Sequence, residues 1–430
     1  MKKCTRRDFL KKAGLAAATI WAGRISLARG ESPNEKLKIG VVGVRGRGHA
    51  NLQDVSKENI VALCDIDDRN LEEAAKEFPL AKKFNDFRKL LDEKDVEAVV
   101  VSTPDHVHAP ASLAALRSGR HVYCEKPLTH TVEEARLVAE AAEKAGVATQ
   151  MGTQIHAEDN YRRVVELIES GAIGDVKEAH VWVGKAWSGA GDRPKDTPPV
   201  PPNIHYDLWL GPAPERPYNP AYIPASWRGW WDFGNGTLGD MACHHMDLSF
   251  WALKLRHPLT IEAEGPPVHP ESAPGWIIVR YEFPRSGDLR TVRLTWYDGG
   301  KRPPQFAEKK LPEWGDGTLF VGDKGMLLAD YGRYVLLPEA DFAGFKPPAP
   351  WIPESVGHHE EWIRAAKTGS RTTCNFDYGG ALTETALLGA VAYRTGKKLQ
   401  WCPRELKARN APEADRFIRK EYRKGWEIRP

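Results

Sequence analysis

The sequence predicts an α/β protein: an N-terminal Rossmann domain, which is a doubly wound parallel sheet, and a C-terminal α/β domain with a large, mostly antiparallel open sheet. Three observations support this. Apolar runs alternate with helical patterns across residues 36–152, a glycine-rich turn follows the first run, and later strand signals gather in residues 276–336. The chain has 430 residues, enough for two domains, and its formal charge of +3 gives no indication of nucleic-acid binding.

Residues 1–30 form a separate segment. Paired arginines at Arg6 and Arg7, then Phe9 and Leu10 and a mildly apolar stretch, are typical of a twin-arginine export signal, and a basic amphipathic helix is the alternative. We therefore expect the twin-arginine export machinery as a partner and the periplasm as the location. No uninterrupted apolar run is long enough for a membrane-spanning helix, so we expect no stable membrane insertion.

The first domain is expected over residues 34–155. Its short, continuously apolar strands alternate with helices, which is typical of a parallel sheet covered on both faces, with ligands at the carboxyl ends of the strands. The expected strands are residues 37–42, 60–64, 96–101, 121–124 and 148–151, and the expected helices include residues 70–78, 109–118 and 132–145.

The turn after the first strand resembles a dinucleotide-binding turn. Glycines there let the backbone approach a pyrophosphate, and the N-terminus of the next helix offers free N–H groups. The middle glycine of the usual spacing is replaced by an arginine, and a tight turn without a ligand is the alternative. The residues expected to contact the cofactor here are Gly43, Arg45, Gly46, Arg47 and Gly48.

The second strand ends in Asp65, about 20 residues after the turn, where an acid can bind both ribose hydroxyls of an adenosine. Its charge would repel a 2′-phosphate, so the expected cofactor is NAD. Arg45 and Arg47 keep NADP open as the alternative.

Polar residues follow the next strands of the sheet, where a ligand would bind. Lys126, fixed by the proline after it, is placed to act on a ligand, although an exposed ion pair is the alternative. His106 and His108 begin a helix and serve either a ligand or the packing. The tail residues expected to contact the cofactor are Thr103, Pro104, Asp105, His108, Glu125, Lys126 and Gln154.

The second domain is expected over residues 156–403, with a helix at 159–170 and a strand at 176–183. Residues 189–228 are rich in proline and aromatic side chains and predict an ordered flap. The indoles of Trp209, Trp227, Trp230 and Trp231 either stack on sugar faces or hold the flap down.

Asp240, His244 and Asp247 follow at i, i+4 and i+7, which places them on one helix face. A carboxylate beside an imidazole suits proton transfer or hydroxyl recognition. The alternatives are a structural pair or a metal site, which has no support from an HExxH or CxxC motif, so we expect no metal.

Four strands are expected at residues 276–283, 291–296, 318–321 and 326–329, followed by helices at 358–367 and 379–395. The second helix is expected to pack across the domain junction, and the tail at 404–430 to face solvent. An open sheet leaves one face without helices, and burial of that face against another subunit predicts a dimer or tetramer.

These separated motifs together resemble the Gfo/Idh/MocA oxidoreductase family, in its exported branch with twin-arginine signals. The motifs are the glycine turn, Thr-Pro-Asp-His-Val-His at 103–108, Glu-Lys-Pro at 125–127, and Gly-Asp-Met-Ala-Cys-His-His-Met-Asp at 239–247. The resemblance implies a bound nicotinamide cofactor, a sugar or cyclitol substrate, and Lys126, Asp240 and His244 as catalytic residues. The chain departs from the family pattern at Arg45, Ala242 and Thr153.

The implied reaction is NAD(P)-dependent oxidation of a sugar, glycoside or cyclitol hydroxyl with a tightly held cofactor. Lys126 accepts or relays the proton, Glu125 holds the lysine, and His244, oriented by Asp240, shares the proton transfer. The alternatives are net glycoside hydrolysis by redox elimination, oxidation of one sugar with reduction of another, and a non-catalytic sugar-binding relative.

Overall fold

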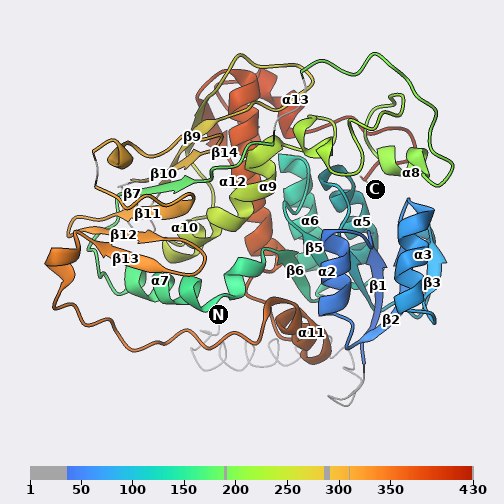
Figure 1. The fold of residues 1–430 in the computed structure, drawn as a ribbon, viewed down its shortest axis with the longest axis horizontal. Helices are drawn as coiled ribbons and strands as arrows, with labels where there is room; N and C mark the ends of the chain where they lie inside the picture. The colour runs from blue at the N-terminus through green and yellow to red at the C-terminus, as the bar shows by residue number, and fades with distance from the viewer. Residues whose placement is uncertain (1–35, 188–190, 285–290, 309, 429–430) are drawn as a thin grey trace, which may run out of the picture. The chain divides into compact units, whose positions relative to one another are not determined.

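The computed structural model describes residues 36–187, 191–284, 291–308 and 310–428 (Figure 1). The expected twin-arginine segment lies outside these residues. Residues Leu37–Pro430 form one compact unit, which is the unit described below.

The first sheet is six-stranded and entirely parallel, in the order β3-β2-β1-β4-β5-β6. Its strands are β1 (Lys38–Val42), β2 (Asn59–Cys64), β3 (Lys82–Phe84), β4 (Ala98–Val101), β5 (His121–Glu125) and β6 (Thr149–Gly152). Its helices are α2 (Arg47–Asp54), α3 (Asp68–Glu77), α4 (Phe87–Leu91), α5 (Asp105–Arg117) and α6 (Val132–Ala145). The order reverses between β1 and β4, which is the switch point where a doubly wound sheet binds its ligand. The predicted Rossmann fold is confirmed, including the helix after the glycine turn (α2), with β3 and α4 added.

The second sheet has nine strands in the order β13-β12-β11-β7-β10-β9-β8-β14-β15. Only β10 and β7 pair in parallel, and the other pairs described are antiparallel, as predicted. The strands are β7 (Glu178–Trp182), β8 (Thr260–Glu264), β9 (Ile278–Pro284), β10 (Thr291–Tyr297), β11 (Gly317–Val321), β12 (Met326–Ala329), β13 (Tyr334–Leu337), β14 (Leu399–Cys402) and β15 (Lys407–Ala408).

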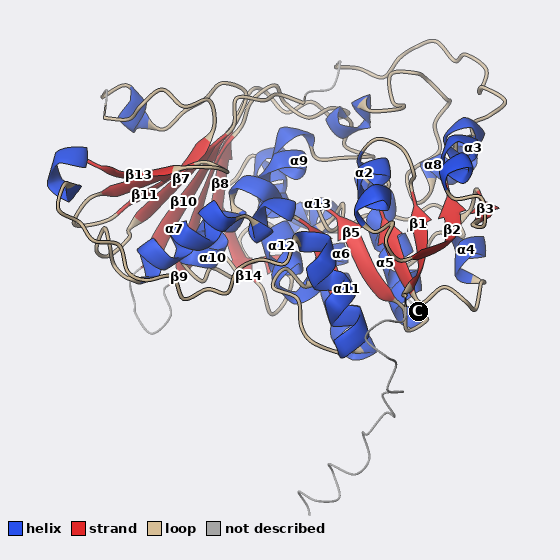
Figure 2. Cartoon of the chain, turned by 60° about the horizontal axis from the view of Figure 1, so that its bottom comes forward, coloured by secondary structure: helices blue, strands red, loops and turns tan. Residues whose placement is uncertain are grey.

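Helices lie against one face of this sheet and between the two sheets (Figure 2). The longest, α12, begins with Asn375 as its side-chain cap and packs on α6, α9 and β8, so the prediction that it crosses the junction is confirmed. The α-helices after β6 are α7 (Asp159–Glu169), α8 (Tyr206–Leu210), α9 (Gly236–His245), α10 (Asp247–Ala252), α11 (His358–Thr368), α12 (Phe376–Thr395) and α13 (Asp415–Ile418). The 3-10 turns are η1 (Gln154–Ala157), η2 (Ser226–Gly229), η3 (Pro304–Phe306), η4 (Glu339–Phe342) and η5 (Pro412–Ala414).

The face of the nine-stranded sheet that was expected to be bare carries two different coverings. The first is the chain itself: Leu311 and Trp314 pack with Trp182 of β7 in one apolar cluster. The second is a set of ion pairs between strand residues, among them Arg293–Glu178 and Arg280–Glu264. The argument for an oligomer from a wholly exposed apolar face is therefore weaker than the sequence implied.

The tail at 404–430 does not simply face solvent, as was expected. Trp426 and Ile428 are buried, and the Trp426 ring lies 6.0 Å from that of Phe87 in the first half of the chain. Arg423 donates to the carbonyl of Gly211 at 2.9 Å, which ties the tail to the flap. Apolar side chains at this spacing gave no periodic signal, so the buried tail was missed.

Candidate functional site

The glycine turn between β1 and α2 depends on missing side chains. A Cβ on Gly48 would lie 2.0 Å from the carbonyl oxygen of Gly43, and a Cβ on Gly43, whose φ is +83°, would lie 2.6 Å from that of Ser102. Gly46 has φ +59° and open space where a Cβ would stand. The Arg45 side chain turns outward to Glu73, at 2.6 Å, so it leaves the space above Gly46 open.

Asp65, directly after β2, supports the same turn. One carboxylate oxygen accepts from the Val44 N–H at 3.0 Å and the other from the Asp67 N–H at 2.9 Å. Burial raises the pKa of Asp65, and these hydrogen bonds oppose that rise. The residue is in the position expected for ribose recognition, and it also fixes the backbone that approaches the pyrophosphate.

These residues fit a dinucleotide. No side chain caps the N-terminus of α2, so the first N–H groups of this helix can donate to a phosphate. The turn before the helix has open space at Gly46. Asp65 is available at the end of β2 for the adenosine ribose. The turn residues Gly43 to Gly48 and Asp65 would therefore hold the adenosine and pyrophosphate portions of NAD.

Glu125, at the end of β5, organises a polar network under the turn. One of its oxygens accepts from Asn51 of α2 at 2.9 Å, from Gln154 at 2.8 Å and from Arg47 at 3.3 Å. Among the described residues the Glu125 side chain makes no hydrogen bond to Lys126. The expected role of Glu125 in holding the lysine is thus wrong, because its acceptor positions face α2 and η1.

The segment after β4 folds back as the start of α5, with Pro104 at its N-cap and the Thr103 hydroxyl on the Pro104 carbonyl at 3.2 Å. His108 is buried, and its two ring nitrogens lie 2.7 Å from the Pro127 carbonyl and 2.8 Å from that of Thr103. His108 therefore joins two loops and does not present its ring to a ligand. His106 is also buried, against the Trp209 carbonyl.

Lys126 lies where the two halves of the chain meet. Its Nζ donates to a side-chain oxygen and to the backbone carbonyl of Asp240 on α9, both at 2.7 Å. Arg228 of η2 donates from Nε to the same Asp240 oxygen at 2.9 Å. Burial alone would raise the pKa of Asp240, but the two cations lower it well below its usual range, so this carboxylate stays ionised.

Two further titratable groups complete the cluster. Burial raises the pKa of Asp105 to about 8, against the opposing charges of Arg228 and Lys126, so this carboxyl is neutral at pH 7. Burial lowers the pKa of His244, and Lys126 adds to that effect. Its Nδ1 has no hydrogen-bond partner within the described ranges. The neutral imidazole and the neutral carboxyl lie around one lysine–carboxylate pair.

The predicted face of Asp240, His244 and Asp247 divides in the structure. Asp240 binds Lys126 and Arg228 and makes no hydrogen bond to His244 in the described part of the chain, so the expected orientation of the imidazole by Asp240 is wrong. Asp247 begins α10 and is buried on His156, at 2.9 Å, and on the Tyr378 hydroxyl. It belongs to the structural pair that was the alternative. The described residues contain no group of three or more histidine, cysteine, aspartate or glutamate side chains that could hold a metal.

The flap tryptophans pack inward. All four tryptophans are buried, which favours a packing role over stacking on sugar faces: Trp209, Trp227 and Trp230 lie in the flap's apolar cluster, and Trp231 lies in the main core. The flap meets the first half through Asn203, whose amide donates to Asp67 at 2.7 Å, and it reaches the second half at Arg228. It therefore runs from beside the expected adenosine position to the Lys126 cluster.

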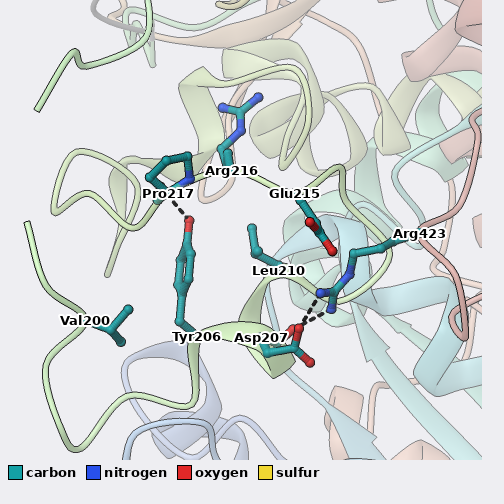
Figure 3. Close-up of a pocket in the computed structure, with 8 residues that line it drawn as sticks. All are labelled: Val200, Tyr206, Asp207, Leu210, Glu215, Arg216, Pro217 and Arg423. Carbon is teal, nitrogen blue, oxygen red and sulfur yellow. Dashed lines mark hydrogen bonds and ion pairs between the residues drawn. The ribbon is translucent and has the colours of Figure 1, made fainter. Parts of the chain in front are cut away.

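A cavity of about 650 Å³ lies between the flap and the tail (Figure 3), and its lining includes neither Lys126, Asp240 nor Arg228. Arg423 points toward Asp207 there, and the guanidinium of Arg216 points away from that pair. Its lining residues are Val200, Tyr206, Asp207, Leu210, Glu215, Arg216, Pro217 and Arg423. The cavity lies where the tail contacts the flap through the ion pair of Arg423 with Asp207.

Arg228 and Asn51 were missed from the sequence. Arg228 stood in a loop without periodicity, and its one signal is that it directly follows a tryptophan, over whose ring it lies at 4.3 Å. Asn51 sits inside α2, a helix too short for its inward face to be recognised, and it bonds both Glu125 and Ser102.

Together, fold and site define a class: a two-domain protein that holds a dinucleotide at the edge of a parallel sheet and places a lysine–carboxylate pair beside it. Residues 37–153 match the model of an oxidoreductase family with an NAD-binding Rossmann fold, and residues 161–290 match the C-terminal α/β domain of the same family. The chain belongs to the Gfo/Idh/MocA oxidoreductase family, as the resemblance predicted.

Named relatives match over part of their length. Inositol 2-dehydrogenase of Salmonella paratyphi B is 34% identical over 150 residues, which are 34% of this chain and 45% of that protein. A glycosyl hydrolase family 109 protein of Shewanella pealeana is 28% identical over 207 residues, 40% of this chain and 44% of that protein. The chain thus matches less than half the length of either relative.

The fold also resembles solved structures. The WlbA dehydrogenase of Bordetella pertussis, in complex with NADH and UDP-GlcNAcA, superposes with a TM-score of 0.59 over 86% of this chain and 99% of that one, at 19% identity. At this identity the likeness supports the fold alone.

Proposed function

We propose that this protein oxidises a hydroxyl of a sugar, glycoside or cyclitol with a bound NAD. The observation that carries the proposal is the Lys126–Asp240 pair at 2.7 Å, at the end of β5 and beside the residues that fit the dinucleotide. The name of the inositol dehydrogenase relative supports a polyhydroxylated substrate.

NAD, when bound, supplies the acceptor for a hydride from the hydroxyl carbon. The protein must then take the hydroxyl proton. Lys126 is the group positioned to relay it: its ammonium first gives a proton to solvent, and the amine that remains takes the hydroxyl proton while two of its N–H groups stay on the two acceptors of Asp240. Asp240 keeps its charge throughout, and the neutral His244 beside it can accept a hydrogen bond from a substrate hydroxyl.

NAD rather than NADP is part of the proposal. Asp65 carries a carboxylate at the ribose position, and the two arginines that kept NADP open have other partners: Arg45 pairs with Glu73 and Arg47 with Glu125. The flap borders both ends of the expected dinucleotide site, which supports a tightly held cofactor that copurifies with the protein.

Net glycoside hydrolysis is the second candidate, and the glycosyl hydrolase family 109 relative favours it. In that reaction the same residues act: oxidation of a hydroxyl to a carbonyl acidifies the neighbouring C–H, whose proton leaves together with the glycosidic group. Water then adds to the double bond and the hydride returns to the carbonyl, so the cofactor would end unchanged. A tightly held cofactor suits this outcome, since no external acceptor is required.

Product mass spectrometry in heavy water separates these functions. Cofactor-loaded protein is mixed with inositol, free sugars and aryl glycosides. A product two hydrogens lighter, with reduced cofactor, supports net oxidation, and a second sugar reduced in step supports the sugar–sugar reaction. A released aglycone with deuterium on the sugar supports hydrolysis. No change across the panel would contradict both and favour a sugar-binding role.

Export and assembly are further parts of the proposal. The arginine pair at Arg6 and Arg7 supports the twin-arginine pathway and a periplasmic location, and cell fractionation of the protein and of an Arg6→Lys, Arg7→Lys variant tests it. Light scattering after size exclusion tests the expected dimer or tetramer. No helix in the described part of the chain is long and apolar enough to cross a bilayer.

A further inference from the structure

The flap packs Arg228 beside the Lys126 pair. Its guanidinium lies 4.3 Å over the ring of Trp227, which is buried in the flap's aromatic cluster. A Cβ on Gly234 would lie 2.9 Å from the Arg228 Cα, so the backbones pack closely here. The position of the side chain is therefore set before any ligand arrives.

Only one edge of this guanidinium is used. Nε donates to Asp240, while the two terminal nitrogens make no hydrogen bond to any described residue. The side chain is 31% exposed. A planar pair of donors remains available next to the lysine that handles the proton.

The charge around these donors is positive. Lys126 and Arg228 share a single oxygen of Asp240. Asp105, the other carboxyl that interacts with these groups, is neutral at pH 7 because burial raises its pKa to about 8. The uncompensated cation favours an anionic partner, and a guanidinium fork pairs most strongly with a carboxylate or a phosphate.

We infer that Arg228 binds an oxyanion carried by the substrate, so that the preferred substrates are sugar acids or sugar phosphates rather than neutral sugars. This inference rests on the proposed function and names the substrate class of the same site. The reacting hydroxyl faces Lys126, and the anionic group lies against the free edge of Arg228.

Isothermal titration of the full chain loaded with NAD tests the inference without requiring turnover. Glucuronate, glucose 6-phosphate and glucose are the probes. We expect one of the two anions to bind at least tenfold more tightly than glucose, and its identity assigns carboxylate or phosphate. Arg228→Gln should weaken the binding of that anion by about 10- to 100-fold, and the loss for glucose should be clearly smaller.

A conservative variant and a matched control accompany Arg228→Gln. Arg228→Lys keeps the charge and loses the fork, so an intermediate affinity is expected. Arg409→Gln is the matched control, because Arg409 is an exposed arginine paired with Glu405, away from the site. NAD content and the far-ultraviolet spectrum show whether each variant is folded.

Three results would overturn the inference. The first is that glucose binds as tightly as both anions. The second is that the affinity for the anion is the same in Arg228→Gln as in the wild type. The third is that Arg228→Gln loses the same affinity for glucose as for the anion, which would make Arg228 a positioning residue for Asp240. A different outcome contradicts the proposed function alone: an anion binds through Arg228, but no oxidised or hydrolysed product forms. The proposed function stands if neutral sugars are oxidised without preference while the inference fails.

Discussion

The glycine turn and the Lys126–Asp240–Arg228 cluster serve one site, but they are built from different kinds of contact. The turn is backbone packed on backbone, and it works because three side chains are missing within a few residues. The cluster is made of charged side chains from segments far apart in the sequence. Substitutions in the turn should therefore act through steric clashes and lower the affinity for the cofactor. Substitutions in the cluster should act through electrostatics and lower the rate of turnover.

The sharpest way to separate the two regions is Lys126→Met. Methionine keeps the length of the side chain and removes its charge, and Asp240 retains Arg228 as a partner, so the fold should survive. We expect product formation to fall about 1,000-fold with NAD content unchanged. Lys346→Met, at an exposed lysine, is the control. Full activity in Lys126→Met would remove this lysine from the mechanism.

The turn is tested by Gly48→Ala against Gly46→Ala. The first places a Cβ against the Gly43 carbonyl and should weaken NAD binding about 100-fold. The second meets nothing within 4 Å and carries only the backbone strain of φ +59° with ψ −118°, which costs about 1–3 kcal/mol. Titration calorimetry with NAD and urea unfolding measure both. Equal losses in the two variants would contradict the steric argument.

Asp105 interacts with the Lys126–Asp240–Arg228 cluster, and its titration tests how buried the cluster is. Its pKa of about 8 lies above the ordinary value of 3.8, so its protonated form stabilises the fold most below about pH 4, and this contribution is lost as pH rises toward 8. Asp105→Asn cannot ionise. The free energy of unfolding of Asp105→Asn minus that of the wild type should therefore increase from pH 5 to pH 8, by up to about 1.4 kcal/mol per pH unit.

Urea unfolding at pH 5, 6.5 and 8 measures that difference. Parallel stability curves for the wild type and Asp105→Asn would show that Asp105 ionises at its ordinary pKa. The carboxyl would then balance the charge of Arg228.

The smallest expected effect belongs to the cofactor side. Asp65→Asn can keep the acceptor for the Val44 N–H, loses the one for the Asp67 N–H and removes the charge, so the preference for NAD over NADP should fall about tenfold. Binding constants for both cofactors measure it, with exposed Asp92→Asn as the control. An unchanged ratio would show that the charge of Asp65 does not select the cofactor.

The same contrast explains what the sequence could predict. The parallel sheet and the glycine turn are local patterns: apolar runs, spacing and a following acid. The long helix α12 was equally visible, because it is apolar on most faces. By contrast β3, Lys82–Phe84, carries two lysines and gave no strand signal.

For the substrate side of the site, the sequence predicted the residues but not which of them pair with one another. Asp240 and Lys126 were both expected, yet Asp240 was assigned to His244, four residues away on its own helix. In the fold it turns to partners more than ten residues away or more than a hundred. Helical spacing shows which side chains share a face, but it cannot show which charge from another segment arrives there.

The tail described above also gives the site an order of assembly. Two tail residues, Arg423 on the flap and Trp426 on Phe87, are synthesised after the segments that they contact. During translation the parallel sheet can form first, since N-terminal units generally fold as they emerge. The flap and its Arg228 can be secured only once this late segment has left the ribosome. A nascent chain should therefore meet its cofactor while the substrate side is still open.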